Sequence, residues 1–477
     1  MRYEMVAGLE THVELLTKSK IFCGCSTEFG GEPNTRVCPV CSGMPGTMPV
    51  LNRRAVECAI LVGLALNCDI THRNKFDRKN YFYPDLPKAY QISQLYFPIC
   101  RDGYLEIDSS DGVKRIGIHE IHMEEDAGKL IHDPWDDRTF VDFNRCGVPL
   151  LEIVTEPDFR SAEEVTAYLE KLREILLFLG VSDCKMQEGS MRADINISVR
   201  PIGSSELGTR TEMKNMNSFK AISRAVEYET RRQIEVIEAG GAIVQQTRRW
   251  DDNKDASFAM RSKENAQDYR YFPEPDLLPL HIDDEWISAA REAMPELAEE
   301  KRRRYMNDFG LSEYDARVLT SFREWALLFE NIAELSGQPK EAANMIMVDI
   351  ARLCSENSIL PENLKISPDK ISALIELITT QKINRTVGKT ALEEIFYRDV
   401  DPVKYVEENE LLAIGDRDEL LAAVKTTLNE CPKSVEDFKN GKQKAFGFLV
   451  GQIMRAFGGK ADPKSVNALL KEELEKI

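Results

Sequence analysis

The chain has 477 residues and carries 80 Asp and Glu against 62 Lys and Arg, a formal net charge of −18. Its 43% hydrophobic and 30% charged residues are typical of a globular protein, which excludes a disordered or fibrous chain. At ~100–200 residues per domain, this length predicts roughly two to four domains. The acidic balance disfavours non-specific binding of nucleic acid except through a local basic patch.

No sequence feature indicates a membrane or secreted protein. The most apolar stretch, Ala59–Cys68, is far shorter than the ~18 residues of a spanning helix. Glu4, Glu10 and Glu14 interrupt any apolar signal segment at the N-terminus. The odd count of 11 cysteines argues against a disulfide framework, so we expect a cytoplasmic protein.

The first 290 residues combine strand and helix patterns. Short β-like runs alternate with turns rich in Gly and Pro, as in antiparallel sheets. One helix begins after Ser161, a suitable N-cap, with Glu164 three residues further on. The expected strands are Tyr3–Leu15, Arg115–Met123, Val148–Thr155 and Arg192–Pro201, and the expected helices are Ala55–Leu66, Ala162–Leu179 and Ser218–Glu238.

From about residue 290 the pattern is almost purely helical, with apolar residues every three or four positions. A further boundary is expected around Asp399–Pro402, where strong helix formers stop. The terminal segment 432–477 holds nine Lys and Arg and six Asp and Glu, a local net charge of 9 − 6 = +3. That segment is a candidate basic patch, although its charge alone favours a solvated helical face.

Four cysteines are spaced as in a metal site. Cys23 and Cys25 form one close pair, and Cys38 and Cys41 form another after a loop that contains Gly30, Gly31 and Pro33. Two such pairs can present four thiolates tetrahedrally to Zn²⁺, and a site closed by four thiolates is structural. The alternative is a group of free or redox-active thiols, and the spacing favours zinc.

The first predicted strand carries a candidate cation site. Because successive side chains of a strand point to opposite faces, Glu10, His12 and Glu14 share one face. A Glu and a His two residues apart on one face can hold a cation together.

Other strands add acidic groups. Alternation places Asp194 on the polar face of residues 192–200 and Glu212 on the polar face of residues 210–214. The segment His122–Lys129 adds a dense acidic turn. Each polar face alone is typical of a solvated sheet. Together they mix carboxylates, a histidine and basic residues, a combination that suits Mg²⁺-dependent phosphate chemistry.

Two segments are candidates for phosphate contacts. Residues 77–88 and 260–273 interleave basic and aromatic residues, a pattern that can hold phosphates and stack on a base. A packed proline-rich loop explains the pattern equally well. The phosphate-binding motif GxxxxGK[ST] is not present, because Ile383 stands where Gly388-Lys389-Thr390 would need a glycine.

Several long segments match the pattern of one known family. The longest, Asp142–Ile153, reads DFNRCGVPLLEI. The others are Val6–Val13, Phe76–Asp85, His122–Lys129, Asp268–Asp276 and Lys444–Met454. They resemble the B subunit of the tRNA-dependent amidotransferases, and the resemblance spans essentially the whole chain.

The resemblance implies an α+β protein. A glutamine-synthetase-like antiparallel β catalytic domain with helices would span residues 1–290, including the zinc-binding loop 23–41. An all-α helical domain would span residues 291–402, and a small helical tail domain, residues 403–477, would contact tRNA.

The resemblance also implies an activity. ATP would phosphorylate the side-chain carboxylate of misacylated Glu-tRNA(Gln) or Asp-tRNA(Asn), and ammonia would then displace the phosphate. An amidase-type glutaminase, the A subunit in this family, would supply the ammonia through a channel, and a small C subunit would complete a heterotrimer. The sequence does not separate the two tRNA substrates.

Residues of this chain take expected roles by the same resemblance. The Mg²⁺ site would comprise Glu10, His12 and Glu125. Asp194 and Glu212 are further candidates for the metal or the ammonia path, and Glu124, Glu125 or Asp126 would line that path. Lys79, Lys88, Arg261 and Lys263 are expected to contact the phosphates of ATP.

Two other functions fit parts of the sequence. A zinc-containing RNA-binding or scaffold protein without catalysis would use the cysteines and the tail, but it would not need carboxylates facing phosphate. A stand-alone ammonia-using ligase acting on a small molecule would not need the basic tail.

Overall fold

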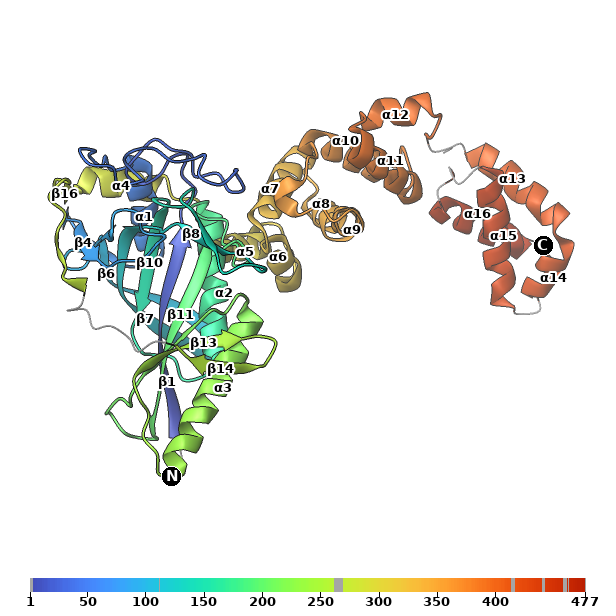
Figure 1. Cartoon of the computed structure of the whole chain (residues 1–477). Coiled ribbons are helices and arrows are strands. Elements are labelled where there is room, and N and C mark those ends of the chain that lie inside the picture. The colour runs from blue at the N-terminus through green and yellow to red at the C-terminus, as the bar shows by residue number, and fades with distance from the viewer. Residues whose placement is uncertain are drawn as a thin grey trace. The chain divides into compact units, whose positions relative to one another are not determined.

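The computed structural model describes residues 3–110, 112–260, 269–412, 417–439, 442–457, 461 and 463–476. The chain divides into two compact units, Met1–Leu297 and Ala298–Ile477 (Figure 1). Among the described residues, no helix is both long enough and apolar enough to cross a membrane.

The first unit is built on one large sheet. Its nine strands lie in the order β14-β13-β12-β11-β1-β10-β7-β6-β2, and three smaller sheets accompany it. The strands are β1 (Tyr3–Glu14), β2 (Asp69–Ile70), β3 (Arg73–Asn74), β4 (Asp77–Asn80), β5 (Tyr90–Ser93), β6 (Cys100–Ser109), β7 (Gly112–Glu125), β8 (Lys129–His132), β9 (Thr139–Asp142), β10 (Pro149–Thr155), β11 (Met191–Pro201), β12 (Thr211–Lys214), β13 (Gln246–Asp251), β14 (Ala256–Ala259), β15 (Phe272–Pro273) and β16 (Leu280–His281).

Helices α1 (Arg53–Ala65), α2 (Ala162–Leu179) and α3 (Phe219–Glu238) pack against this sheet. Helix α4 (Asp284–Glu292) packs against α1. In β1, Leu9, Thr11 and Val13 are buried, and the side chains of Leu9 and Val13 belong to the core beneath the helices. The polar residues between them point to the opposite face, because side chains alternate along a strand. The sheet thus separates an apolar core from a polar face.

The sheet and helix expectations are confirmed, with two differences. First, the strand pairs of the large sheet are antiparallel except for β12 and β13, which run parallel because α3 crosses between them. Second, Glu124 and Glu125 belong to the end of β7 and not to a turn. The described elements of the second unit are all helices, so the α+β class followed by helical domains is confirmed.

The second unit contains two apolar cores. The first core runs in sequence from Tyr305 to Val406 and the second from Leu420 to Leu474. The helices are α5 (Ala298–Asp308), α6 (Glu313–Leu319), α7 (Arg323–Ser336), α8 (Pro339–Asn344), the π-helix η2 (Met345–Ile350), α9 (Ala351–Glu356), the 3₁₀-helix η3 (Pro361–Asn363), α10 (Pro368–Thr379), α11 (Arg385–Arg398), α12 (Pro402–Glu408), α13 (Arg417–Glu430), α14 (Pro432–Lys439), α15 (Gln443–Ala456) and α16 (Pro463–Lys476).

Candidate active site

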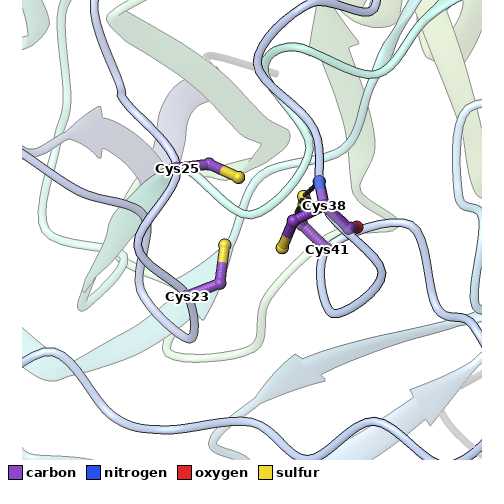
Figure 2. Close-up of side chains that lie close together, drawn as sticks. All are labelled: Cys23, Cys25, Cys38 and Cys41. Atoms are coloured by element: carbon purple, nitrogen blue, oxygen red, sulfur yellow. Dashed lines mark hydrogen bonds between the residues drawn. The ribbon is translucent and has the colours of Figure 1, made fainter.

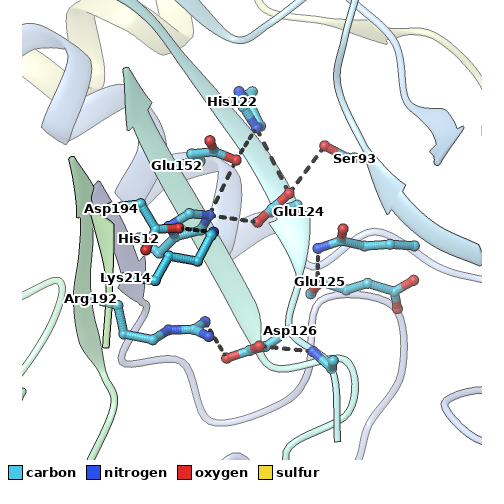
Figure 3. Close-up of polar contacts among 12 residues, drawn as sticks. His12, Ser93, His122, Glu124, Glu125, Asp126, Glu152, Arg192, Asp194 and Lys214 are labelled. Atoms are coloured by element: carbon cyan, nitrogen blue, oxygen red, sulfur yellow. Dashed lines mark hydrogen bonds and ion pairs between the residues drawn. The ribbon is translucent and has the colours of Figure 1, made fainter. Parts of the chain in front are cut away.

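The polar face of the large sheet gathers ionisable side chains from adjacent strands. β1 lies between β10 and β11, and its register places Glu10 opposite Asp194 and His12 opposite Glu152. β7 pairs with the far side of β10. Figure 3 shows the resulting cluster of acidic and basic side chains. The alternation of each strand therefore builds the site.

His12, Glu124 and Glu152 form a first group, whose ligand atoms all lie within 4.8 Å of one another. Nε2 of His12 lies 3.3 Å from Oε2 of Glu152 and 3.7 Å from Oε1 of Glu124. His122 approaches from β7, and its Nε2 lies 2.9 Å from the same oxygen of Glu152 (Figure 3). Two carboxylates and an imidazole with converging atoms can hold a divalent cation.

The carboxylates control the protonation of both histidines. Burial alone would lower the pKa of His12 and of His122, but the charges and hydrogen bonds of Glu152 and the neighbouring carboxylates together reverse that effect. The pKa of His12 is raised, and that of His122 rises to about 10. The carboxyl of Glu152 ionises readily despite its burial, because the two imidazoles hold its pKa well below the usual value.

Glu10, Asp194 and Glu212 form a second group, with ligand atoms within 4.8 Å of one another. Lys214 is ion-paired with Asp194 and lies 3.6 Å from Oε1 of Glu212. Asn196 donates a hydrogen bond of 2.9 Å to Glu10. Because Glu10 and His12 are two residues apart on β1, the two groups are separated by roughly 7 Å along the strand.

A third set of charges lies further along the same face. Nη2 of Arg192 donates to Asp126 at 2.9 Å, and Nε of Arg145 lies 3.6 Å from the same carboxylate. Burial, together with the charge of Asp126, raises the pKa of Glu14 to about 8. The carboxyl group of Glu14 thus keeps its proton next to the ionised carboxylate of Asp126.

Glu125 lies apart from these groups. Because it follows Glu124 on β7, its side chain points to the opposite face of the sheet. There its carboxylate is ion-paired with Lys88 and accepts a hydrogen bond of 2.9 Å from the amide of Ile92. It lines a pocket of about 210 Å³ together with Lys20 and Cys41. The sequence does not predict that Glu124 and Glu125 point to opposite faces, because residues 122–129 are expected to form a turn and not the end of a strand.

Among the expected phosphate contacts, Lys79 lies close enough to the first group to interact with Glu124 and Glu152. Its Nζ lies 5.0 Å from the ring centre of Tyr269 and 5.9 Å from that of Tyr81. Burial lowers the pKa of Lys79, but Glu124, Glu152 and two tyrosines nearby together raise it more, so the ammonium stays charged. Lys88 lies beside Glu125, whereas Arg261 and Lys263 fall outside the described residues.

The four cysteines Cys23, Cys25, Cys38 and Cys41 converge as their spacing predicts. All their sulfurs lie within 4.8 Å of one another, and all four cysteines are free of disulfides. Figure 2 shows Cys23 and Cys25 on one loop facing Cys38 and Cys41 on the next. The amide of Cys38 donates to Sγ of Cys41 at 3.2 Å. Four soft sulfur donors at this spacing fit Zn²⁺.

Glu152 of the first group and the adjacent His122 are not predicted as site residues from the sequence. In the sequence, Glu152 and His122 appear only as parts of longer motifs, although Glu152 contacts both His12 and His122 in the structure. A signal for Glu152 was present: it is the only charged residue in the strand PLLEIVT. A lone carboxylate in an apolar strand needs a partner, so it is a candidate functional residue.

Comparisons with known proteins define the class of this chain. A family model described as the GatB/GatE catalytic domain matches residues 5–288, and a model described as the GatB domain matches residues 327–474. The first unit is therefore a catalytic domain of the GatB/GatE type, and the polar sheet face lies within it.

Curated relatives place the chain more narrowly. It is 61% identical over 475 residues to a protein of Lachnoclostridium phytofermentans, covering 99% of each chain. It is 58% identical over 480 residues to one of Caldicellulosiruptor bescii, covering 100% of each. Both are named as the B subunit of aspartyl/glutamyl-tRNA(Asn/Gln) amidotransferase. The chain belongs to this family of amidotransferase B subunits.

Proposed function

We propose that this chain amidates the side chain of misacylated Glu-tRNA(Gln), Asp-tRNA(Asn) or both, in an ATP-dependent ligase reaction. The names of its relatives support the tRNA-dependent amide transfer. The observation that carries the proposal is the pair of carboxylate groups, His12-Glu124-Glu152 and Glu10-Asp194-Glu212, on one sheet face. A scaffold protein without catalysis has no use for such a face, and the comparisons do not support that alternative.

The chemistry explains why this face is needed. A carboxylate resists attack by ammonia because an oxide would have to leave. Transfer of the γ-phosphoryl group of ATP to a carboxylate oxygen converts the leaving group to phosphate, and ammonia then attacks the carbonyl carbon. Mg²⁺ bound at these carboxylates would neutralise the charge on the phosphates. Lys79 supplies a fixed cation close to the same place.

The two groups differ in their fit to Mg²⁺. The resemblance predicts a Mg²⁺ site of Glu10, His12 and Glu125, but these three side chains lie in different groups of the structure. His12 lies with Glu124 and Glu152, whereas Glu125 is paired with Lys88. We assign the first cation to His12, Glu124 and Glu152, because Mg²⁺ uses one or two carboxylates and leaves room for phosphate and water. Glu10, Asp194 and Glu212 are a second candidate, in which Lys214 already offsets part of the charge.

Ammonia must reach the acyl phosphate unprotonated, and a glutaminase A subunit with a small C subunit would supply it. Glu124, Glu125 and Asp126 are the buried acids at the end of β7. We propose that Glu124, Glu125 or Asp126 lines the route and accepts the proton of incoming ammonium. The helical domain and tail, expected at 291–402 and 403–477, would hold the tRNA. The free thiols of all 11 cysteines suit a reducing cytoplasm.

We further propose that Cys23, Cys25, Cys38 and Cys41 bind a structural Zn²⁺. A site with four protein thiolates leaves no position for substrate. The metal would then stabilise the loop between the cysteine pairs, and two of its ligands, Cys23 and Cys41, line the same pocket as Glu125.

The proposed function is tested in the complete enzyme. The chain is co-expressed with an amidase-type glutaminase and a small third protein of the complex, and amide formation is measured on both misacylated tRNAs with and without ATP. Glu10→Ala or Glu125→Ala should abolish amidation while glutamine hydrolysis by the partner continues. Undiminished amidation in either variant would contradict its role, and amidation without ATP would contradict the reaction.

A further inference from the structure

A lysine lies buried against the cysteine group. Lys20 has 0% exposure, and its Nζ lies 3.5 Å from Sγ of Cys41 and 3.4 Å from the carbonyl oxygen of Phe143. A fully buried lysine is rare because an ammonium group loses its hydration there. Glu125 borders the same pocket, but its carboxylate is engaged by Lys88 and by the amide of Ile92.

The cysteine group supplies the missing negative charge. Four thiolates around Zn²⁺ carry a net charge of −2, because each thiolate contributes −1 against the +2 of the ion. An ammonium group that donates to one thiolate sulfur offsets part of that charge. Groups that hydrogen-bond to metal ligands in this way orient the ligands and tune the affinity for the metal.

Lys20 also ties the cysteine group to a second segment, residues 143–148. The amide of Ile21 donates to the carbonyl of Gly147 at 2.9 Å, and Sγ of Cys146 lies 3.5 Å from the carbonyl of Cys41. The amide of Arg36, in the loop between the cysteine pairs, donates to Oδ1 of Asn144 at 2.8 Å. The loop that would surround the metal is therefore bonded to this segment at several points.

Segment 143–148 in turn holds the acidic end of β7. Arg145 donates to the carbonyl of Ala127 at 3.0 Å and to that of Gly128 at 2.8 Å. The amide of Gly147 donates to the carbonyl of Asp126 at 2.9 Å. On the polar sheet face, the carboxylate of Asp126 accepts a hydrogen bond from Arg192. A continuous set of contacts thus leads from the cysteine group to the candidate active site.

We propose that Lys20 is a positioning residue that couples the metal site to the active site. Its ammonium balances the charge of the metal-bound thiolates and fixes segment 143–148 against them, so that Arg145 keeps Asp126 in place. This inference rests on the proposed zinc site.

The first test is zinc release from the full-length chain. Lys20→Met keeps the length of the side chain and removes its charge, and Lys18→Met, at an exposed position nearby, is the matched control. Transfer of zinc to a chromogenic chelator should be between about 10- and 100-fold faster in Lys20→Met. Lys18→Met should match the wild-type protein, and Lys20→Arg should restore slow release because it keeps the charge.

The outcomes separate this inference from the proposed zinc site. Wild-type protein that contains no zinc would overturn both. Wild-type protein that contains zinc, with release from Lys20→Met within twofold of the wild-type rate, would overturn the coupling role alone.

The second test needs no variant and covers the case in which Lys20→Met does not fold. Hydrogen exchange of the wild-type protein is compared before and after zinc is removed by the chelator. The amides of Ile21, Asp126 and Gly147 should exchange at least about tenfold faster without zinc, while helix α2 keeps its protection. Unchanged exchange at Asp126 and Gly147 after zinc removal would contradict the proposal.

Discussion

Oε2 of Glu152 lies 3.3 Å from Nε2 of His12, across the pairing of β10 with β1. The same oxygen is 2.9 Å from Nε2 of His122 on the other side. Glu152 is therefore the central acceptor of the first group, and the orientation of His12 depends on it. A residue that no single motif singled out thus joins three strands of the sheet.

The role of Glu152 is tested by a change that removes only its charge. Glu152→Gln should lower kcat for ATP-dependent amidation by about 10²–10³-fold, because the amide cannot hold a cation or orient His12 as the carboxylate does. Glutamine hydrolysis by the complex should continue. Glu156→Gln, at an exposed position just after β10, is the control and should retain full activity. Amidation by Glu152→Gln at the wild-type rate would show that the group has no part in the reaction.

Lys79 is expected to act on ATP. Its ammonium is charged and lies close to Glu124, so Lys79→Met should raise KM for ATP by about tenfold or more through loss of a phosphate contact. Lys75→Met, just before β4 and against the rings of Tyr96 and Phe97, is the matched control. Steady-state kinetics at saturating tRNA measure the effect. An unchanged KM for ATP would place the phosphates elsewhere.

The buried carboxyl of Glu229 should make stability depend on pH. Burial opposes its ionisation, but hydrogen bonds from Arg232, Thr211 and Gln233 outweigh that and lower its pKa. The ionised form therefore stabilises the fold above the unfolded-state pKa of about 4.3, and this contribution is lost as pH falls through the lower folded-state pKa.

Glu229→Gln should accordingly lower the free energy of unfolding by about 2 kcal/mol at neutral pH, and the difference from wild type should shrink below about pH 4. Urea unfolding of the full chain across this range measures it. The exposed Glu227→Gln on the same helix should change little at any pH. A deficit that stays constant down to the most acidic pH would show that ionisation of Glu229 is not its source.

Zinc content tests the cysteine group. Protein purified without chelators should hold about one zinc per chain, and Cys25→Ser should hold less than about a tenth of that, because structural zinc needs all four ligands. The variant should also melt at a lower temperature, since metal binding contributes to folding. Cys431→Ser, outside the group, should keep its zinc. Full zinc content in Cys25→Ser would refute the assignment of this ligand.

The sequence predicted the parts of the fold that local patterns determine. The alternation of Tyr3–Leu15 placed Glu10 and His12 on one face, and the close cysteine spacing placed four sulfurs together. Which strands become neighbours depends on the whole sheet, so the approach of β7 and β10 to β1 was not visible. For this reason Glu152 was not assigned, and Glu125 was grouped with His12 although strand alternation directs it to Lys88.

Isotope transfer from the substrate tests the central claim, activation of the carboxylate by phosphorylation, most directly. The complete enzyme is given ATP, glutamine and misacylated tRNA whose side-chain carboxylate carries ¹⁸O, and the released inorganic phosphate is analysed by mass spectrometry. The account predicts one ¹⁸O atom in the phosphate for each amide formed, because the carboxylate oxygen leaves with the phosphoryl group. Amide formation with unlabelled phosphate would contradict an acyl phosphate intermediate.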